Sequence, residues 1–210
     1  DMPKSAPFFK DISFFDKSFN GIVPIEIWID SKRENGIVKP ATLKRMNKLQ
    51  EVIDEYDELA PPISVVNVVK FAKQAYYNGN PNYYSLPTTQ ENSFIYPYLS
   101  KVSADSKILN GYVDSTGQYG RITTFMQDIE TDRMELIEAE LKKAINKIFP
   151  EKRYDVNITG KSLLFLKGTK YLIKNLILSL SLAILLIAFF MAYLFRSFKM
   201  ILISLIPNLL

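Results

Sequence analysis

The chain has 210 residues, of which 48% are hydrophobic, and a formal net charge of +4. It contains neither histidine nor cysteine, which excludes disulfides, thiol chemistry, histidine-based zinc sites and a Ser-His-Asp triad within the chain. We predict no catalytic, metal-binding or cofactor-binding residue and no enzyme, although a metal site of carboxylates alone stays open. The basic residues are scattered and form no nucleic-acid-binding motif, so we expect no nucleic-acid partner.

Residues 1–23 are dominated by phenylalanine, and we predict an irregular segment there. Such a segment suits packing over a membrane surface or lining a hydrophobic groove. Phe14, Phe15 and Phe19 are the candidate residues for this apolar lining or for a subunit contact. The alternative is a short helix that is docked on the core.

Alternation and helical spacing predict the next elements. Residues 24–30 read PIEIWID, which predicts a strand with Ile25, Ile27 and Ile29 on the buried face. Pro40 suits the first turn of a helix that runs to about Asp57, before two prolines. Residues 63–78 are predicted as extended and then helical. Residues 79–118 predict a long irregular insert with a short helical piece around 90–99. The tyrosine-rich stretch 76–84 is a second candidate for an apolar lining or a subunit contact.

Order returns in the second half of the soluble part. We predict a strand over 120–128, a helix over 130–149 with an apolar stripe, and a strand over 154–159. The stripe of this helix is formed by Met134, Ile137, Leu141, Ala144, Ile145 and Ile148. These elements predict an α+β domain over residues 1–160, with helices on one face of a small sheet.

The remaining residues predict attachment to a membrane. Residues 176–195 carry no charge and reach about 30 Å as a helix, which matches the hydrocarbon core of a bilayer. We expect an interfacial linker over 161–175, a transmembrane helix over 176–195, a turn over 196–199 and the truncated start of a second transmembrane helix over 200–210. Pro207 and Asn208 suit an intramembrane kink with freed polar groups, or simply a helix end. The chain is then a piece of a multi-pass protein, whose partners are the lipid bilayer and its remaining transmembrane helices.

Several short motifs, in this order, resemble a known transporter family. The motifs are Phe15-Asp16 with Gly21, Pro24-Ile25-Glu26, Phe195-Arg196-Ser197-Phe198 and Ile206-Pro207-Asn208. Together they resemble the second large extracytoplasmic loop and the following helix of resistance-nodulation-division (RND) transporters of the mycobacterial-membrane-protein-large type. The similarity extends over nearly the whole chain.

The resemblance implies a porter-type domain with ferredoxin-like βαβ pieces in the periplasm. It implies that residues 176–195 are the eighth of twelve helices in a bacterial inner membrane, and that the protein is a proton-driven exporter. The substrate would be hydrophobic, either lipidic or amphiphilic, and a homo-oligomer is possible. The proton-carrying residues of that family lie on helices outside this chain. A membrane-tethered periplasmic sensor or binding domain is the alternative, and a membrane-anchored enzyme lacks a residue constellation at usable spacing.

Overall fold

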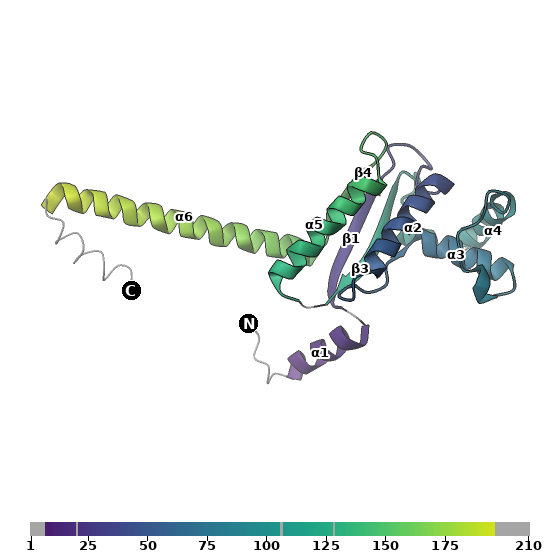
Figure 1. Cartoon of the computed structure of the whole chain (residues 1–210), viewed down its shortest axis with the longest axis horizontal. Helices are drawn as coiled ribbons and strands as arrows, with labels where there is room; N and C mark the ends of the chain where they lie inside the picture. Colours follow the sequence, from purple (N-terminus) through teal and green to yellow (C-terminus); the bar gives the residue numbers. More distant parts are fainter. Residues whose placement is uncertain (1–6, 20, 106, 128, 196–210) are drawn as a thin grey trace. The chain divides into compact units, whose positions relative to one another are not determined.

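The computed structural model describes residues 7–19, 21–105, 107–127 and 129–195. The chain forms two compact units, Asp1–Leu163 and Leu164–Leu210. The first unit contains a four-stranded sheet and several helices, and the second is built on one long apolar helix (Figure 1). This agrees with the predicted combination of an α+β domain and a C-terminal apolar helix.

The sheet of the first unit has the order β2-β3-β1-β4, and all neighbouring strands are antiparallel. The strands are β1 (Val23–Asp30), β2 (Ile63–Ser64), β3 (Tyr119–Met126) and β4 (Asp155–Thr159). In the central strand β1, Ile25, Ile27 and Ile29 are buried and Trp28 points to the other face, as predicted. Each of the three predicted strands is therefore confirmed, and β2 adds a short fourth.

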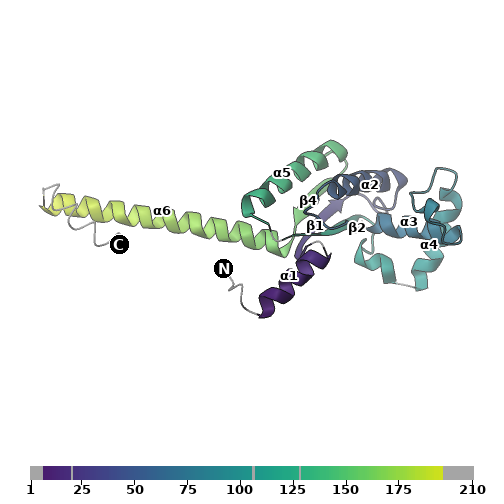
Figure 2. The same cartoon turned by 60° about the horizontal axis from the view of Figure 1, so that its bottom comes forward.

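Two helices cover one face of this sheet (Figures 1 and 2). Helix α2 (Pro40–Asp54) connects β1 to β2, and α5 (Thr131–Ile148) connects β3 to β4. Each helix thus joins two strands that run in the same direction with one other strand between them. The core lies between this helical layer and the sheet, and contains Ile27, Ile29, Leu43, Met46, Leu49, Ile53, Ile122, Ile137 and Leu141.

A long insert separates β2 from β3. It contains α3 (Val65–Tyr76), the 3-10 turn η1 (Pro81–Tyr83), α4 (Asn92–Asp105) and the 3-10 turn η2 (Lys107–Gly111). Ser64 caps α3 by accepting from the Val66 N–H, while the Asn67 side chain accepts from the Ser64 N–H. The predicted change from extended to helical chain is confirmed, and the short helical piece expected near 90–99 is the first part of α4.

Over residues 7–19 the structure shows the short helix that was the alternative and not an irregular segment, because α1 (Pro7–Phe19) is an α-helix. The physical signal is the spacing of Phe8, Ile12 and Phe15, which lie four and three residues apart and therefore share one helix face. Gly21 follows the helix; its N–H donates to the Asp16 carbonyl at 3.0 Å and its φ is +134°. A Cβ atom there would lie 2.5 Å from the carbonyl carbon of Met126, so the position requires glycine.

The second unit is built on α6 (Lys161–Phe195), a continuous helix of 35 residues. Its stretch Gly168–Leu194 has 27 residues and a mean hydropathy of 2.6, and none of its most apolar window is buried by protein. At about 1.5 Å per residue this stretch is long enough to cross a bilayer, so α6 is a candidate membrane span. The segment predicted as a linker, residues 161–175, forms the first turns of the same helix.

Candidate functional site

The insert presents a group of aromatic rings in mutual contact. Tyr76 of α3 packs against Phe94 and Tyr98 of α4, with ring centroids 5.1 and 5.6 Å apart. Tyr77 stacks on Tyr83 of η1 with centroids 4.0 Å apart. Tyr76 is nevertheless 45% exposed and Tyr83 38% exposed. The tyrosine-rich stretch 76–84 thus forms a half-exposed aromatic surface, which we call the aromatic surface of the insert.

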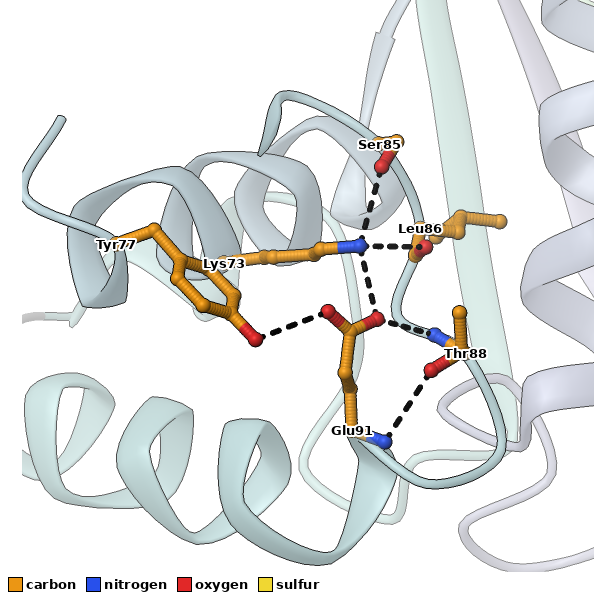
Figure 3. Close-up of polar contacts among 6 residues, drawn as sticks. All are labelled: Lys73, Tyr77, Ser85, Leu86, Thr88 and Glu91. Atoms are coloured by element: carbon orange, nitrogen blue, oxygen red, sulfur yellow. Dashed lines mark hydrogen bonds and ion pairs between the residues drawn. The ribbon is translucent and has the colours of Figure 1, made fainter. Parts of the chain in front are cut away.

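A buried ion pair contacts Tyr77 of this surface (Figure 3). The Lys73 Nζ atom of α3 donates to Glu91 Oε2 at 2.8 Å, to Ser85 Oγ at 3.2 Å and to the Leu86 carbonyl at 3.5 Å. Tyr77 OH donates to the second carboxylate oxygen of Glu91 at 3.2 Å. The Lys73 and Glu91 side chains are only 6% and 15% exposed. These contacts connect α3 to the loop that precedes α4.

Glu91 also starts α4. The Thr88 N–H donates to Glu91 Oε2 at 2.7 Å, and the Glu91 N–H donates to Thr88 Oγ1 at 3.3 Å. This reciprocal pair is a capping box, which satisfies two backbone donors at the beginning of a helix. One carboxylate therefore serves both the ion pair with Lys73 and the cap of α4.

The hydrogen bonds of this cluster keep the Glu91 carboxyl group ionised. The hydrogen bond from Lys73, followed by that from the Thr88 N–H, lowers the pKa of Glu91 from 4.5 to about 2. Burial and the hydrogen bond to Glu91 raise the pKa of Tyr77. Because Glu91 stays ionised at any neutral pH and both its oxygens are bound, it is not suited to carry protons. The cluster is suited to hold the aromatic surface in place.

The insert is connected to the core through a second polar group. Gln50 of α2 is buried, and its Nε2 donates to the Pro62 carbonyl at 2.8 Å and to Asn67 Oδ1 at 2.7 Å. Ser64 Oγ donates to Gln50 Oε1 at 3.3 Å. Since Asn67 and Ser64 also cap α3, the same atoms orient the insert relative to the helical layer.

The face of the sheet opposite α2 and α5 is a further exposed surface, which we call the open sheet face. Trp28 and Phe125 are each 43% exposed, and Tyr119 is 40% exposed. Arg121 faces Trp28 across the strands and forms an ion pair with Glu26 at 3.4 Å. The open sheet face therefore combines aromatic rings with a charged pair in its middle.

A groove of about 940 Å³ runs along the outer side of the helical layer. It is lined by apolar residues that include Ala144 and Ile148, and by charged residues of which four are basic and two acidic, namely Lys44, Arg45, Lys48, Lys147, Glu51 and Glu55. Asn47 also lines this groove. Its Oδ1 atom is buried and accepts no hydrogen bond from the described residues. This groove is open and mildly basic.

Of the residues predicted as a lining, the stretch 76–84 forms the aromatic surface of the insert, whereas the phenylalanines belong to α1. Phe14 and Phe15 are on α1, where they are 64% and 53% exposed. The side chain of Phe19 lies outside the described residues, as do Pro207 and Asn208 and the whole of residues 196–210. Within the described part of the chain, no group of three or more acidic side chains is placed to hold a metal ion.

Sequence reasoning did not single out the Lys73–Glu91 pair. The spacing Thr88-x-x-Glu91 is a recognisable capping signature, so the start of α4 had a local signal. Lys73 had none, because its partner lies 18 residues away in a loop whose path the sequence does not predict.

No protein-family model matches the chain, and the search of curated proteins found no match. Its function is therefore inferred from the residues and their geometry.

Proposed function

We propose that this chain is the second extracytoplasmic porter-like domain, with its following membrane helix, of an RND-type exporter in a bacterial inner membrane. The exporter uses a proton gradient to move lipidic or amphiphilic compounds. The domain lies in the periplasm and α6 spans the membrane. The observation that carries the proposal is the direct continuation of a mixed sheet-and-helix unit into a helix of membrane-spanning length.

The sheet topology supports the porter-type assignment. The order β4-β1-β3-β2, with antiparallel neighbours and both connecting helices on one face, is the arrangement expected of two ferredoxin-like βαβ pieces. The insert between β2 and β3 is then an addition to this basic arrangement. Surface insertions of this kind often carry function rather than core.

The aromatic surface of the insert suits contact with an amphiphilic substrate. Tyrosine offers an apolar ring and a polar hydroxyl, which is the combination that an amphiphile requires. Phe71, Tyr76 and Tyr84 are 65%, 45% and 43% exposed. The Lys73–Glu91 pair holds the helices that carry these rings, so the surface is preorganised.

The test is transport by the full-length protein in proteoliposomes that are loaded with a fluorescent amphiphilic dye. We expect an imposed proton gradient to drive dye movement, and a protonophore to abolish it. The double substitution Tyr76→Ser with Tyr83→Ser should reduce the rate several-fold. Leu136→Ser on α5, which removes an equally exposed apolar side chain (48%) outside the insert, should not. Dye movement that is indifferent to the gradient would contradict proton coupling.

A membrane-tethered sensor or binding domain is the second candidate. The groove between α2 and α5 favours it, because its basic side chains outnumber its acidic ones and lie with apolar Ala144 and Ile148 in one lining, which suits a small amphiphilic acid. A sensor would bind such a ligand in the groove and show no gradient-driven transport. Binding measured by calorimetry on the same preparation, with Lys48→Ala as the groove variant, separates the two functions.

A further inference from the structure

A long part of the insert is almost free of charge. Residues 74–100 contain one charged side chain, that of Glu91, whereas 23% of the whole chain is charged. That carboxylate is already paired with the buried Lys73. The same stretch holds seven aromatic residues and six side-chain amides. Exposed rings that are accompanied by amides instead of charges mark an interaction site.

The rings of this stretch are held by contacts between different elements. Tyr77 stacks on Tyr83 of η1 with an angle of 13° between the ring planes, and its hydroxyl group donates to Glu91 at 3.2 Å. Tyr76 packs against Phe94 of α4 at an angle of 33°. Tyr76 and Tyr83 are nonetheless exposed. A ligand therefore meets rings whose orientation is already fixed, so binding does not have to order them.

Unused amide groups lie next to these rings in the chain. Asn78, Asn80 and Asn82 are all exposed. Within the described residues, the one side-chain hydrogen bond of these three is accepted by Asn80 Oδ1, from the Asn82 N–H at 3.0 Å. The turn that carries them is held by Gln74, whose Nε2 donates to the Gly79 carbonyl at 3.0 Å. Each of the three amides thus keeps its donors, and two keep their acceptor as well, for a ligand.

We propose that the aromatic surface of the insert binds neutral sugar rings. The face of a pyranose ring carries C–H groups that pack on an aromatic ring, and its hydroxyl groups both donate and accept hydrogen bonds, as an amide does. An uncharged sugar needs no counter-charge, and residues 74–90 contain no charged side chain. The proposal names the polar part of the amphiphile and to that extent rests on the proposed function.

Two other kinds of partner fit this surface less well. An acidic ligand is met by Lys70, whose Nζ lies 5.8 Å from the centroid of the Tyr84 ring, but Lys73 is neutralised by Glu91. A protein partner draws binding energy chiefly from Trp, Tyr and Arg, and residues 74–100 contain neither Trp nor Arg. The charged side chains of a protein would also find no counter-charge in that stretch. A neutral sugar is therefore the occupant that this surface favours.

The test is binding to the full chain in phosphatidylcholine nanodiscs, which contain no sugar, measured by saturation-transfer difference NMR. The probes are maltohexaose and mannohexaose as neutral sugars, and hexagalacturonate as an acidic sugar of the same length. The variants are Tyr83→Ser, which removes a ring, Tyr83→Phe, which keeps it, and Asn82→Ala. Tyr119→Ser removes a tyrosine of similar exposure (40% against 38%) from the open sheet face and is the matched control.

We expect at least one neutral sugar to show saturation transfer, with a signal several-fold larger than that of hexagalacturonate. Tyr83→Ser and Asn82→Ala should each lower this signal several-fold, whereas Tyr83→Phe and Tyr119→Ser should leave it unchanged. The inference would be overturned by the absence of transfer to both neutral sugars, by an equal signal for the acidic sugar, or by an equal loss in Tyr119→Ser. If no sugar bound and the chain instead self-associated in detergent solution through Tyr83, the surface would be a protein contact, which also overturns the inference.

The outcome is separate from that of the transport experiment. Gradient-driven dye movement without sugar binding would overturn this inference alone. Sugar binding without gradient-driven movement would support this inference and contradict the proposed transport.

Discussion

Glu91 is the residue on which the insert depends most. Its carboxylate binds Lys73, Tyr77 and the Thr88 N–H at once, and its pKa is lowered from 4.5 to about 2. Because the pKa is lower in the folded than in the unfolded chain, the stabilisation is complete above about pH 4.5. It is lost as the pH falls towards 2. The linked free energy is at most about 3 kcal/mol, since each pKa unit corresponds to about 1.4 kcal/mol.

Glu91→Gln should therefore destabilise the insert by about 2 kcal/mol at pH 7, because it leaves Lys73 buried without its counter-charge. Hydrogen exchange of residues 65–113 in the detergent-solubilised full chain measures the effect. Glu34→Gln, at an exposed position, is the matched control and should leave exchange unchanged. The difference between wild type and Glu91→Gln should also shrink as the pH is lowered from 5 to 3, and an undiminished difference would refute the linkage.

Gly160 determines how closely the chain passes β1 on its way to α6. Its φ is +154°, and a Cβ atom would lie 2.5 Å from the Pro24 carbonyl oxygen. We expect Gly160→Ala to lower the free energy of unfolding of the first unit by about 2 kcal/mol, because both backbone strain and a clash with main chain result. Gly111→Ala, where no atom lies within 4 Å of the added Cβ, serves as control in the same denaturant titration. Equal stability of the two variants would contradict the close approach.

At the scale of the element, α6 differs from α2 and α5 in what surrounds it. Its apolar window has no buried residue, whereas α2 and α5 bury their stripes against the sheet. In water, an apolar helix that no other part of the protein covers exposes a large apolar surface, which is unfavourable in free energy. A bilayer around α6 would remove that cost.

A charge at the middle of α6 should therefore impair insertion. Leu182 lies near the centre of the stretch Gly168–Leu194, and Leu182→Arg costs about 3 kcal/mol on insertion. The measurement is the fraction of the full chain that resists alkaline extraction from membranes, with Leu182→Ile as the matched apolar control. If Leu182→Arg remained fully membrane-bound while the first unit lost stability, α6 would be a packed helix and not a span.

At the scale of the whole molecule, the two units have separate sources of stability. The buried apolar residues of the described chain lie within residues 25–154, entirely in the first unit. We therefore expect the first unit to fold without α6.

We expect residues 1–163, expressed alone, to unfold in a single cooperative transition and to partition into the aqueous phase of a detergent phase separation. The full chain should partition into the detergent phase because of α6. Circular dichroism during urea unfolding monitors the first property, and gel analysis of the two phases the second. A shortened chain that is soluble but shows no cooperative transition would mean that the first unit requires the second.

The sequence by itself determined the elements whose apolar residues repeat regularly. The alternation of Ile25, Ile27 and Ile29 predicted β1, the stripes of α2 and α5 predicted both covering helices, and the uncharged run 176–195 predicted the apolar part of α6. These signals are local, because each element buries one face and the period of that face is written in neighbouring residues. The helical spacing in α1 was equally local, but its abundance of phenylalanine obscured it.

Only the tertiary structure decided the order of the strands, the position of the insert and the partner of Lys73. The order of strands depends on which strand edges pair. The pairing of β1 with β3 and with β4 joins residues that are 89 to 133 positions apart in the sequence. The burial of the Lys73–Glu91 pair depends on how a loop of irregular chain folds back onto α3. Such long-range contacts follow from packing of the whole unit, and no repeat in the sequence encodes them.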